Sequence, residues 1–65
     1  MRVFVNGEPL ELPEATTVSA LLEQLALPGP VAVEVDREIV PRDERAARVL
    51  AAEAQVEIVH FVGGG

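Results

Sequence analysis

The sequence predicts an α+β fold, in which one main helix covers one face of a mixed sheet of four or five strands. Three observations favour this class. Segments with alternating, β-rich residues open and close the 65-residue chain, at 1–5 and 56–62. Between them, residues 18–25 carry apolar side chains at helical spacing. The composition, 49% hydrophobic and 25% charged, is that of a globular chain, and the length suits a single domain.

The first twelve residues predict a β-hairpin. Residues 1–5 alternate in polarity, and 8–12 alternate again as a return strand. Asn6-Gly7 stands between them, and this pair favours a type I′ turn, which needs positive φ at both central positions. Pro9 lacks an N–H group and therefore suits the start of a strand or an edge position.

A helix is predicted after the connection 13–17. Thr16 or Thr17 can act as its N-cap, because a threonine hydroxyl accepts a hydrogen bond from a free backbone N–H of the first turn. The helix should stop before Leu27, where Pro28-Gly29-Pro30 supplies a terminator. One apolar stripe along it faces the core, formed by Val18, Leu21, Leu22 and Leu25.

The second half of the chain predicts further strands. Residues 31–35 are apolar enough for a central strand that is buried on most of both faces. Residues 36–38 form a turn, and Ile39-Val40 forms a short strand that Pro41 ends. A short helical turn within 42–48 and a strand around 48–50 follow.

The final strand, 56–62, is the most apolar one, and the loop 51–55 precedes it. We expect the first and last strands to lie side by side and parallel near the centre of the sheet. That arrangement is the β-grasp, or ubiquitin-like, architecture. The expected organisation is a β-grasp domain over 1–62 and a flexible glycine tail over 63–65.

The tail is the part of the sequence that points to chemistry. Gly63, Gly64 and Gly65 extend at most ~10 Å, at ~3.3–3.6 Å per residue, as an arm without side chains. Such an arm can enter a narrow channel in another protein and present its terminal carboxylate. An ionised carboxylate is a poor electrophile, so it must be activated, and a mixed anhydride with AMP is the obvious route. An ATP-using partner enzyme has to supply that step, because the chain has no phosphate-binding loop.

Composition excludes several other functions. The chain has no cysteine and a single histidine, so disulfides, thiolate zinc sites and a cysteine nucleophile are absent, and a metal site is not expected. A domain this small has little room for a catalytic cleft, which favours a carrier or binding module over an enzyme. The net charge of −6 disfavours nucleic acid and anionic membranes as partners and favours a partner with a basic patch. We expect a cytoplasmic protein, since the chain shows neither a signal peptide nor a membrane span.

The whole chain resembles the ThiS family, the ubiquitin-like sulfur carriers of thiamine (thiazole) biosynthesis. The resemblance rests on the opening Val3-Phe4-Val5-Asn6-Gly7-Glu8, the helix start Thr17-Val18-Ser19-Ala20-Leu21-Leu22, the stretch Ile39-Val40-Pro41-Arg42 and the final Gly64-Gly65. The chain departs from the family pattern at two turns, at Glu53-Ala54-Gln55 and at Asp36-Arg37. These departures leave the tail intact.

The resemblance implies a mechanism. A ThiF-like adenylating enzyme would use ATP and magnesium to convert the Gly65 carboxylate to a glycyl adenylate. Sulfur from a cysteine desulfurase or another donor would convert this to a terminal thiocarboxylate, a 1-thioglycine. A ThiG-like thiazole synthase would then take the sulfur. The absence of cysteine and lysine fits this role, because no side-chain thiol or amine of the carrier competes for the activated terminus.

Val59 and Phe61 are candidate partner-docking residues. They alternate along the last strand with Ile58, His60 and Val62, so one set faces the helix and the other can form an apolar patch that leads to the tail. Plain burial of Val59 and Phe61 is the alternative. We interpret His60 as a surface strand residue. Arg42, Arg45 and Arg48 are interpreted as a solvated face that offsets nearby glutamates, with partner recognition as the alternative.

Three other functions remain open from the sequence. A MoaD-like carrier would deliver sulfur to molybdopterin or to tRNA, although the aromatic-proline stretch of such chains is absent before Gly63. A ubiquitin-like modifier would form isopeptide bonds with other proteins. A non-covalent β-grasp interaction domain would make no chemical use of its tail.

Overall fold

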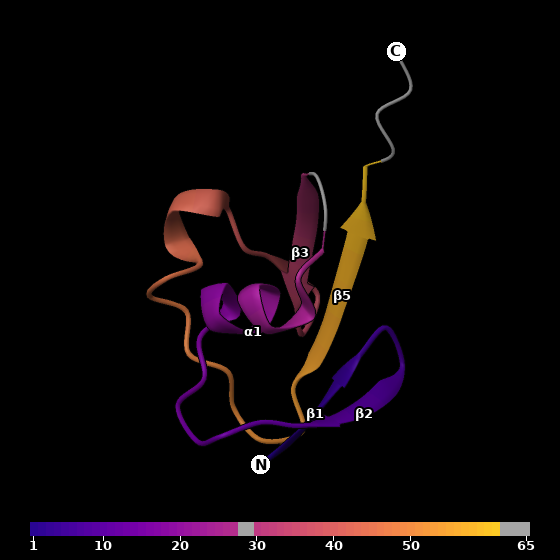
Figure 1. The fold of residues 1–65 in the computed structure, drawn as a ribbon, viewed down its shortest axis with the longest axis vertical. Helices are drawn as coiled ribbons and strands as arrows, with labels where there is room; N and C mark the ends of the chain where they lie inside the picture. Colours follow the sequence, from indigo (N-terminus) through magenta and orange to yellow (C-terminus); the bar gives the residue numbers. More distant parts are fainter. Residues whose placement is uncertain (28–29, 62–65) are drawn as a thin grey trace.

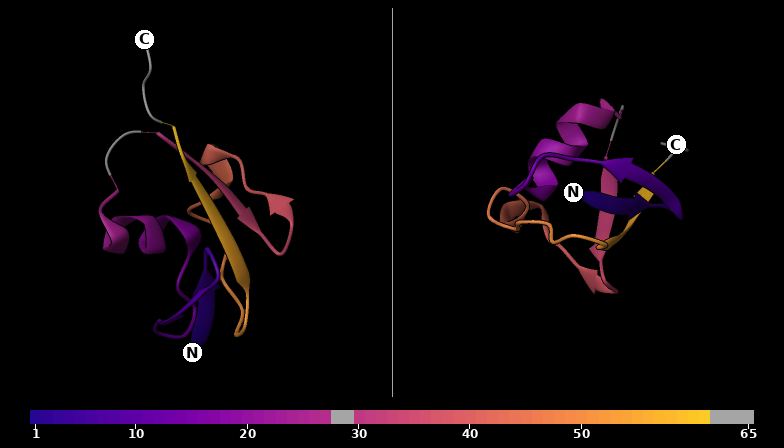
Figure 2. Two further views of the ribbon diagram at one scale, coloured as in Figure 1. Left: turned by 90° about the vertical axis from the view of Figure 1, so that its right-hand side faces the viewer. Right: turned by 90° about the horizontal axis from the view of Figure 1, so that it is seen from below.

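The computed structural model describes residues 1–27 and 30–61. Within these residues the chain forms five strands, one α-helix and one 3₁₀-helix: β1 (Arg2–Val5), β2 (Glu8–Glu11), α1 (Val18–Leu25), β3 (Val31–Val35), β4 (Glu38–Ile39), η1 (Arg42–Glu44) and β5 (Gln55–His60). Figures 1 and 2 show α1 on one side of the sheet. The predicted two-layer α+β fold is therefore confirmed.

The sheet has the strand order β2-β1-β5-β3-β4. β1 pairs with β5 in parallel, with Phe4 opposite Gln55 and Val5 opposite Val56. The other pairings are antiparallel, and β3 follows β5 over five residue pairs. The first and last strands are thus adjacent, parallel and central, as predicted, and the topology is that of a β-grasp fold. Figure 1 shows β5 running away from the N-terminus toward the opposite end of the molecule.

Local sequence signals explain most element boundaries. Asn6 and Gly7 have φ values of 50° and 84°, as the predicted type I′ turn requires. The Thr17 hydroxyl accepts a hydrogen bond from the Ala20 N–H at 3.1 Å, so Thr17 is the N-cap. The helix ends before Leu27, as predicted, but Ala26 closes it in a left-handed conformation at φ 50°. The expected terminator Gly29 lies outside the described residues.

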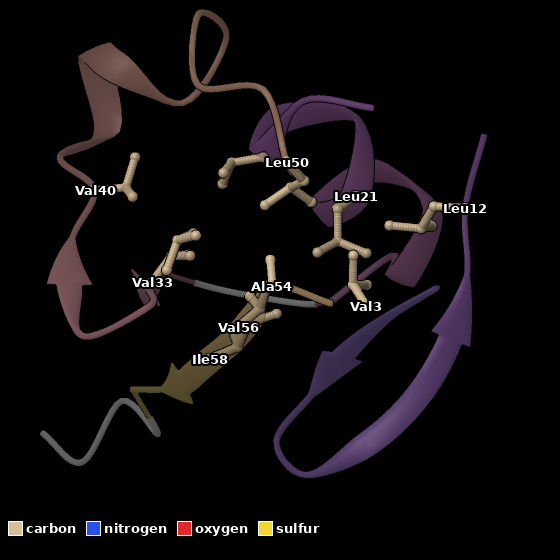
Figure 3. Packing of buried hydrophobic residues seen from close by; sticks show 11 residues of the cluster. Val3, Leu12, Leu21, Val33, Val40, Leu50, Ala54, Val56 and Ile58 are labelled. Carbon is tan, nitrogen blue, oxygen red and sulfur yellow. The ribbon is translucent and has the colours of Figure 1, made fainter. Parts of the chain in front are cut away.

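The core lies between α1 and the sheet. Figure 3 shows its side chains converging from the helix, the strands and the segment after η1. Val18 and Leu21 of the predicted helical stripe are fully buried, and Leu22 and Leu25 pack at its edge. The buried set is Val3, Leu12, Val18, Leu21, Val33, Val35, Val40, Leu50, Ala54, Val56 and Ile58.

The predicted strand around 48–50 is wrong. Val49 makes only an isolated bridge with Thr17 and is 54% exposed, whereas Leu50 is buried. The segment pairs with the connection before α1 instead of the sheet, because Leu50 N–H donates to the Thr16 carbonyl at 2.9 Å and Val18 N–H donates to the Arg48 carbonyl at 2.9 Å. The helical turn expected within 42–48 is the 3₁₀-helix η1.

Two expectations about strand burial and length also change. β3 is buried on one face only, since Glu34 is exposed and Ala32 is half-buried on the side that α1 does not cover. The short fourth strand is Glu38–Ile39, one residue earlier than predicted, and Val40 turns into the core. β5 spans Gln55–His60 rather than 56–62, and Val62 lies outside the described residues.

Candidate functional site

The predicted chemistry belongs to Gly63, Gly64 and Gly65, and these three residues lie outside the described residues. The last described residue before them is Phe61. The structure therefore defines the platform that precedes the tail: the end of β5, its neighbouring strands and the sheet face around it.

Hydrogen bonds hold β5 from both sides. On the β1 side, the Asn6 N–H donates to the Val56 carbonyl at 2.8 Å. The Asn6 side-chain amide also donates to the Ile58 carbonyl at 3.2 Å, and its oxygen accepts from the Ile58 N–H at 2.8 Å. On the β3 side, pairing continues to Val31 opposite His60, and the Phe61 N–H donates to the Pro30 carbonyl at 3.1 Å. The backbone is thus fixed as far as Phe61.

The side chain of Asn6 positions β5 through its two hydrogen bonds to Ile58. The sequence analysis did not predict this role, because it interpreted Asn6 only as a turn residue. An asparagine amide can donate and accept at once, so it can stand in for the backbone of one more strand residue. The available signal was the choice of asparagine in a turn where glycine or aspartate would also serve.

The side chains of β5 divide between two faces. Val56 and Ile58 are buried against the core, whereas Val59 and Phe61 are 57% and 56% exposed. The alternative that Val59 and Phe61 are simply buried in the core is therefore wrong. Ile39 of β4, which the sequence did not single out, is 74% exposed. We call the sheet side opposite α1 the outer face; along β3, β4, β5 and the residue after β5 it includes Ala32, Glu34, Ile39, Glu57, Val59 and Phe61.

The outer face is hollowed between β4 and β5. A shallow cavity of about 90 Å³ is lined there by Ala32, Val33, Glu34, Ile39, Glu57 and Val59. We call this cavity the outer furrow. A larger groove of about 460 Å³ lies on the α1 side, between the β1–β2 hairpin, the end of α1 and the end of β5. His60 is exposed, as expected, and borders this groove.

Three of the five arginines, Arg2, Arg45 and Arg48, form contacts within the fold. Arg2 forms a two-point ion pair with Glu53, with Nη2 at 2.7 Å from Oε1, and hydrogen bonding to this guanidinium lowers the pKa of Glu53. Arg48 pairs with Glu38 at 3.0 Å, which fits the interpretation that these arginines offset glutamates. Arg45 differs, since its guanidinium donates to the Val31 carbonyl at 2.8 Å and helps to fix the start of β3.

The described residues hold neither a metal-binding cluster nor a membrane-spanning helix. Across residues 1–27 and 30–61, no group of three or more histidine, cysteine, aspartate or glutamate side chains is placed to hold a metal ion. Neither helix within those ranges has the length and apolar character that crossing a bilayer demands.

Comparison with known proteins identifies the family. The ThiS family model matches residues 2–65, which is nearly the whole chain. The chain belongs to the ThiS family. The resemblance noted in the sequence is thus confirmed.

Solved structures agree with this assignment. The crystal structure of the thiamine biosynthesis protein ThiS from Geobacter metallireducens is similar to this chain with a TM-score of 0.85 and 32% identity, over 100% of both chains. The solution structure of a thiamine biosynthesis protein from the same organism gives a TM-score of 0.81 at 32% identity, over 100% of this chain and 88% of that one.

Curated relatives include longer proteins. The thiazole synthase of Magnetococcus marinus is 42% identical over 66 aligned residues, which cover 100% of this chain and 20% of that protein. The thiazole synthase of Paramagnetospirillum magneticum is 39% identical with the same coverage. This ThiS-family chain therefore spans about a fifth of the length of the curated relatives that it matches.

Proposed function

We propose that this chain is a non-catalytic sulfur carrier for thiazole formation in thiamine biosynthesis, with Gly65 as the residue that carries the sulfur. The observation that carries the proposal is the ThiS family match, which extends through the terminal glycines to residue 65. The fixed end of β5 supports it, because hydrogen bonds hold the chain as far as Phe61, two positions before the first tail glycine, Gly63.

The chemistry would proceed in two stages. In a ThiF-like adenylating enzyme, the Gly65 carboxylate attacks the α-phosphorus of ATP with magnesium present, and pyrophosphate leaves to give the glycyl adenylate. The terminal sulfur of a persulfide on a cysteine desulfurase or a similar donor then attacks the Gly65 carbonyl carbon; a C–S bond forms, and AMP leaves to give an acyl persulfide. A second thiol attacks the donor cysteine's sulfur and cleaves the S–S bond that came with the persulfide. The thiol and the donor cysteine become a disulfide, and a 1-thioglycine thiocarboxylate is left on Gly65.

The carrier itself would contribute a thin tail and a docking surface, and no catalytic group. Gly63 and Gly64 carry no side chains, so this stretch fits a channel too narrow for ordinary residues. Val59 and Phe61, both more than half exposed, would dock against the partner that receives the tail. The chain has no lysine or cysteine that could capture the activated terminus.

A ThiG-like thiazole synthase is the proposed acceptor of the sulfur. The support is that a segment similar to this chain forms about a fifth of two proteins named thiazole synthase. The same family match favours this acceptor over molybdopterin or tRNA. Because activation consumes ATP, we propose a cytoplasmic location.

ATP–pyrophosphate exchange tests the proposal. The chain ending at Gly65 should support exchange when it is mixed with a ThiF-like enzyme, ATP and magnesium. A variant extended by two residues beyond Gly65 should not, because its α-carboxylate lies elsewhere. Equal exchange by both proteins would contradict the proposal.

A further inference from the structure

Two glutamates face each other on the outer face. Glu34 of β3 and Glu57 of β5 are direct cross-strand partners, and both side chains are exposed on the side opposite α1. Directly opposed residues in an antiparallel pair have Cβ atoms about 5 Å apart, and like charges at this position destabilise the sheet. The fold thus carries a repulsive pair at its centre, between β3 and the strand that leads to the tail.

Neither Glu34 nor Glu57 takes part in an ion pair of the described chain. Among residues 1–27 and 30–61, the ion pairs join Arg2 to Glu53, Arg48 to Glu38 and the N-terminal amine to Glu11. Arg45 donates to backbone carbonyls. The two carboxylates therefore present unneutralised negative charge to whatever approaches the outer face.

Apolar side chains frame the acidic pair. Ile39 lies opposite Glu34 on the β4 side, and Val59 follows Glu57 along β5 by two residues. All four residues line the outer furrow. The furrow thus combines apolar side chains with two carboxylates. It suits a partner side chain with a hydrocarbon stem and a cationic head, such as arginine or lysine.

We propose that the outer furrow binds a basic side chain of the adenylating enzyme, which places its charged head between Glu34 and Glu57 and its stem against Ile39 and Val59. This inference rests on the proposed function, since it concerns the enzyme that receives the tail. Continuity along the chain supports it, because Glu57 and Val59 lie on β5, and Phe61 follows β5 on the way to the tail. A second copy of the chain is a poor occupant, because the net charge is −6 and two such faces would bring four carboxylates together.

Steady-state exchange kinetics test the inference. The double variant Glu34→Gln/Glu57→Gln removes the charge and keeps the shape. Its KM as a substrate of a ThiF-like enzyme should rise about tenfold with unchanged kcat, because the lost contact lies away from the reacting carboxylate. The control Glu14→Gln/Glu23→Gln changes the net charge equally at exposed sites on the loop before α1 and on α1, and its KM should stay within about twofold.

A stability measurement separates binding from misfolding. Removing a like-charge cross-strand pair should raise the thermal midpoint of the Glu34→Gln/Glu57→Gln variant, so weaker binding would accompany a more stable fold. Glu57→Lys supplies a cation within the chain itself and should weaken binding at least as much.

The outcomes distinguish the two proposals. Exchange by the wild-type chain with an equal KM for the Glu34→Gln/Glu57→Gln variant overturns the furrow inference and leaves the proposed function standing. An equal rise in KM for both double variants also overturns it, since net charge alone would then act. If the Glu34→Gln/Glu57→Gln variant keeps its KM in exchange but binds a ThiG-like thiazole synthase more weakly in a direct binding assay, the choice of partner is overturned. No exchange by the wild-type chain overturns both proposals.

Discussion

The side-chain amide of Asn6 makes two hydrogen bonds with the backbone of Ile58, donating to its carbonyl at 3.2 Å and accepting from its N–H at 2.8 Å. This pairing lies beyond Val5, the last residue of β1, at a point where the chain has already entered the hairpin turn. Asn6 therefore prolongs the parallel β1–β5 contact by its side chain. It links the N-terminal hairpin to the strand that precedes the tail.

Replacing Asn6 by glycine tests this link without disturbing the turn. Glycine accepts the positive φ of residue 6, so Asn6→Gly removes only the side-chain bonds and leaves the part-buried Ile58 backbone groups unpaired. The free energy of unfolding in urea should fall by about 1–3 kcal/mol. Hydrogen exchange at the Ile58 amide should become faster. Unchanged stability and exchange would show that the turn alone accounts for Asn6.

A pair of alanine substitutions should separate the core from the outer face. Leu21 is fully buried between α1 and the sheet, so Leu21→Ala should cost about 2–5 kcal/mol through lost burial and a residual cavity. Ile39 is 74% exposed, so Ile39→Ala should change stability by no more than about 0.5 kcal/mol. Urea unfolding measures both. Similar losses for the two variants would contradict the assigned layers.

The Arg2–Glu53 ion pair predicts a pH-dependent contribution to stability. Hydrogen bonding to Arg2 lowers the folded-state pKa of Glu53 below its ordinary value of 4.5. The pair therefore stabilises the fold above the unfolded-state pKa, and this contribution disappears as the pH falls through the folded-state pKa.

Glu53→Gln should accordingly lower the urea midpoint at pH 7, and this deficit should shrink as the pH falls through the folded-state pKa of Glu53. Glu14→Gln is the matched control, since no ion pair in the described chain involves Glu14. A deficit of Glu53→Gln that is constant from pH 7 to strongly acidic pH would contradict the electrostatic account.

Local signals allowed much of the fold to be predicted from sequence. The Asn6-Gly7 turn and the threonine N-cap depend on residues within a few positions of each other, so the local sequence was enough to predict them. The structure of the 48–50 segment could not be predicted in this way, because its partners are Thr16 and Val18, thirty or more positions away. Its β-branched Val49 favoured a strand, and long-range pairing overrode that preference.

The candidate site was predictable only in part. The tail glycines, and the alternation that places Val59 and Phe61 on one face, can be recognised from a short stretch of the sequence. The outer furrow could not be predicted from the sequence, because the position of Glu34 opposite Glu57 depends on the register between β3 and β5. A shift of that register by one residue would place a different side chain opposite Glu34.

Substitution within the tail should separate activation from folding. Gly64→Val adds a branched side chain to a segment proposed to enter a narrow channel, so adenylation should fall to background. Gly64→Ala should retain an intermediate rate. The core residues of the described chain extend to Ile58 and its backbone hydrogen bonds include Phe61, all before position 64, so circular dichroism and thermal midpoint should match the wild type for both variants. Full exchange activity of Gly64→Val would contradict the channel.

The intact mass of the chain tests the central claim, that the terminal carboxylate of Gly65 carries the sulfur. Protein purified from cells that make thiamine should contain a fraction heavier by the mass difference between sulfur and oxygen, located on Gly65 by fragmentation and absent from cells without the adenylating enzyme. A single unmodified mass in thiamine-making cells, or adducts joining Gly65 to lysines of other proteins, would contradict it.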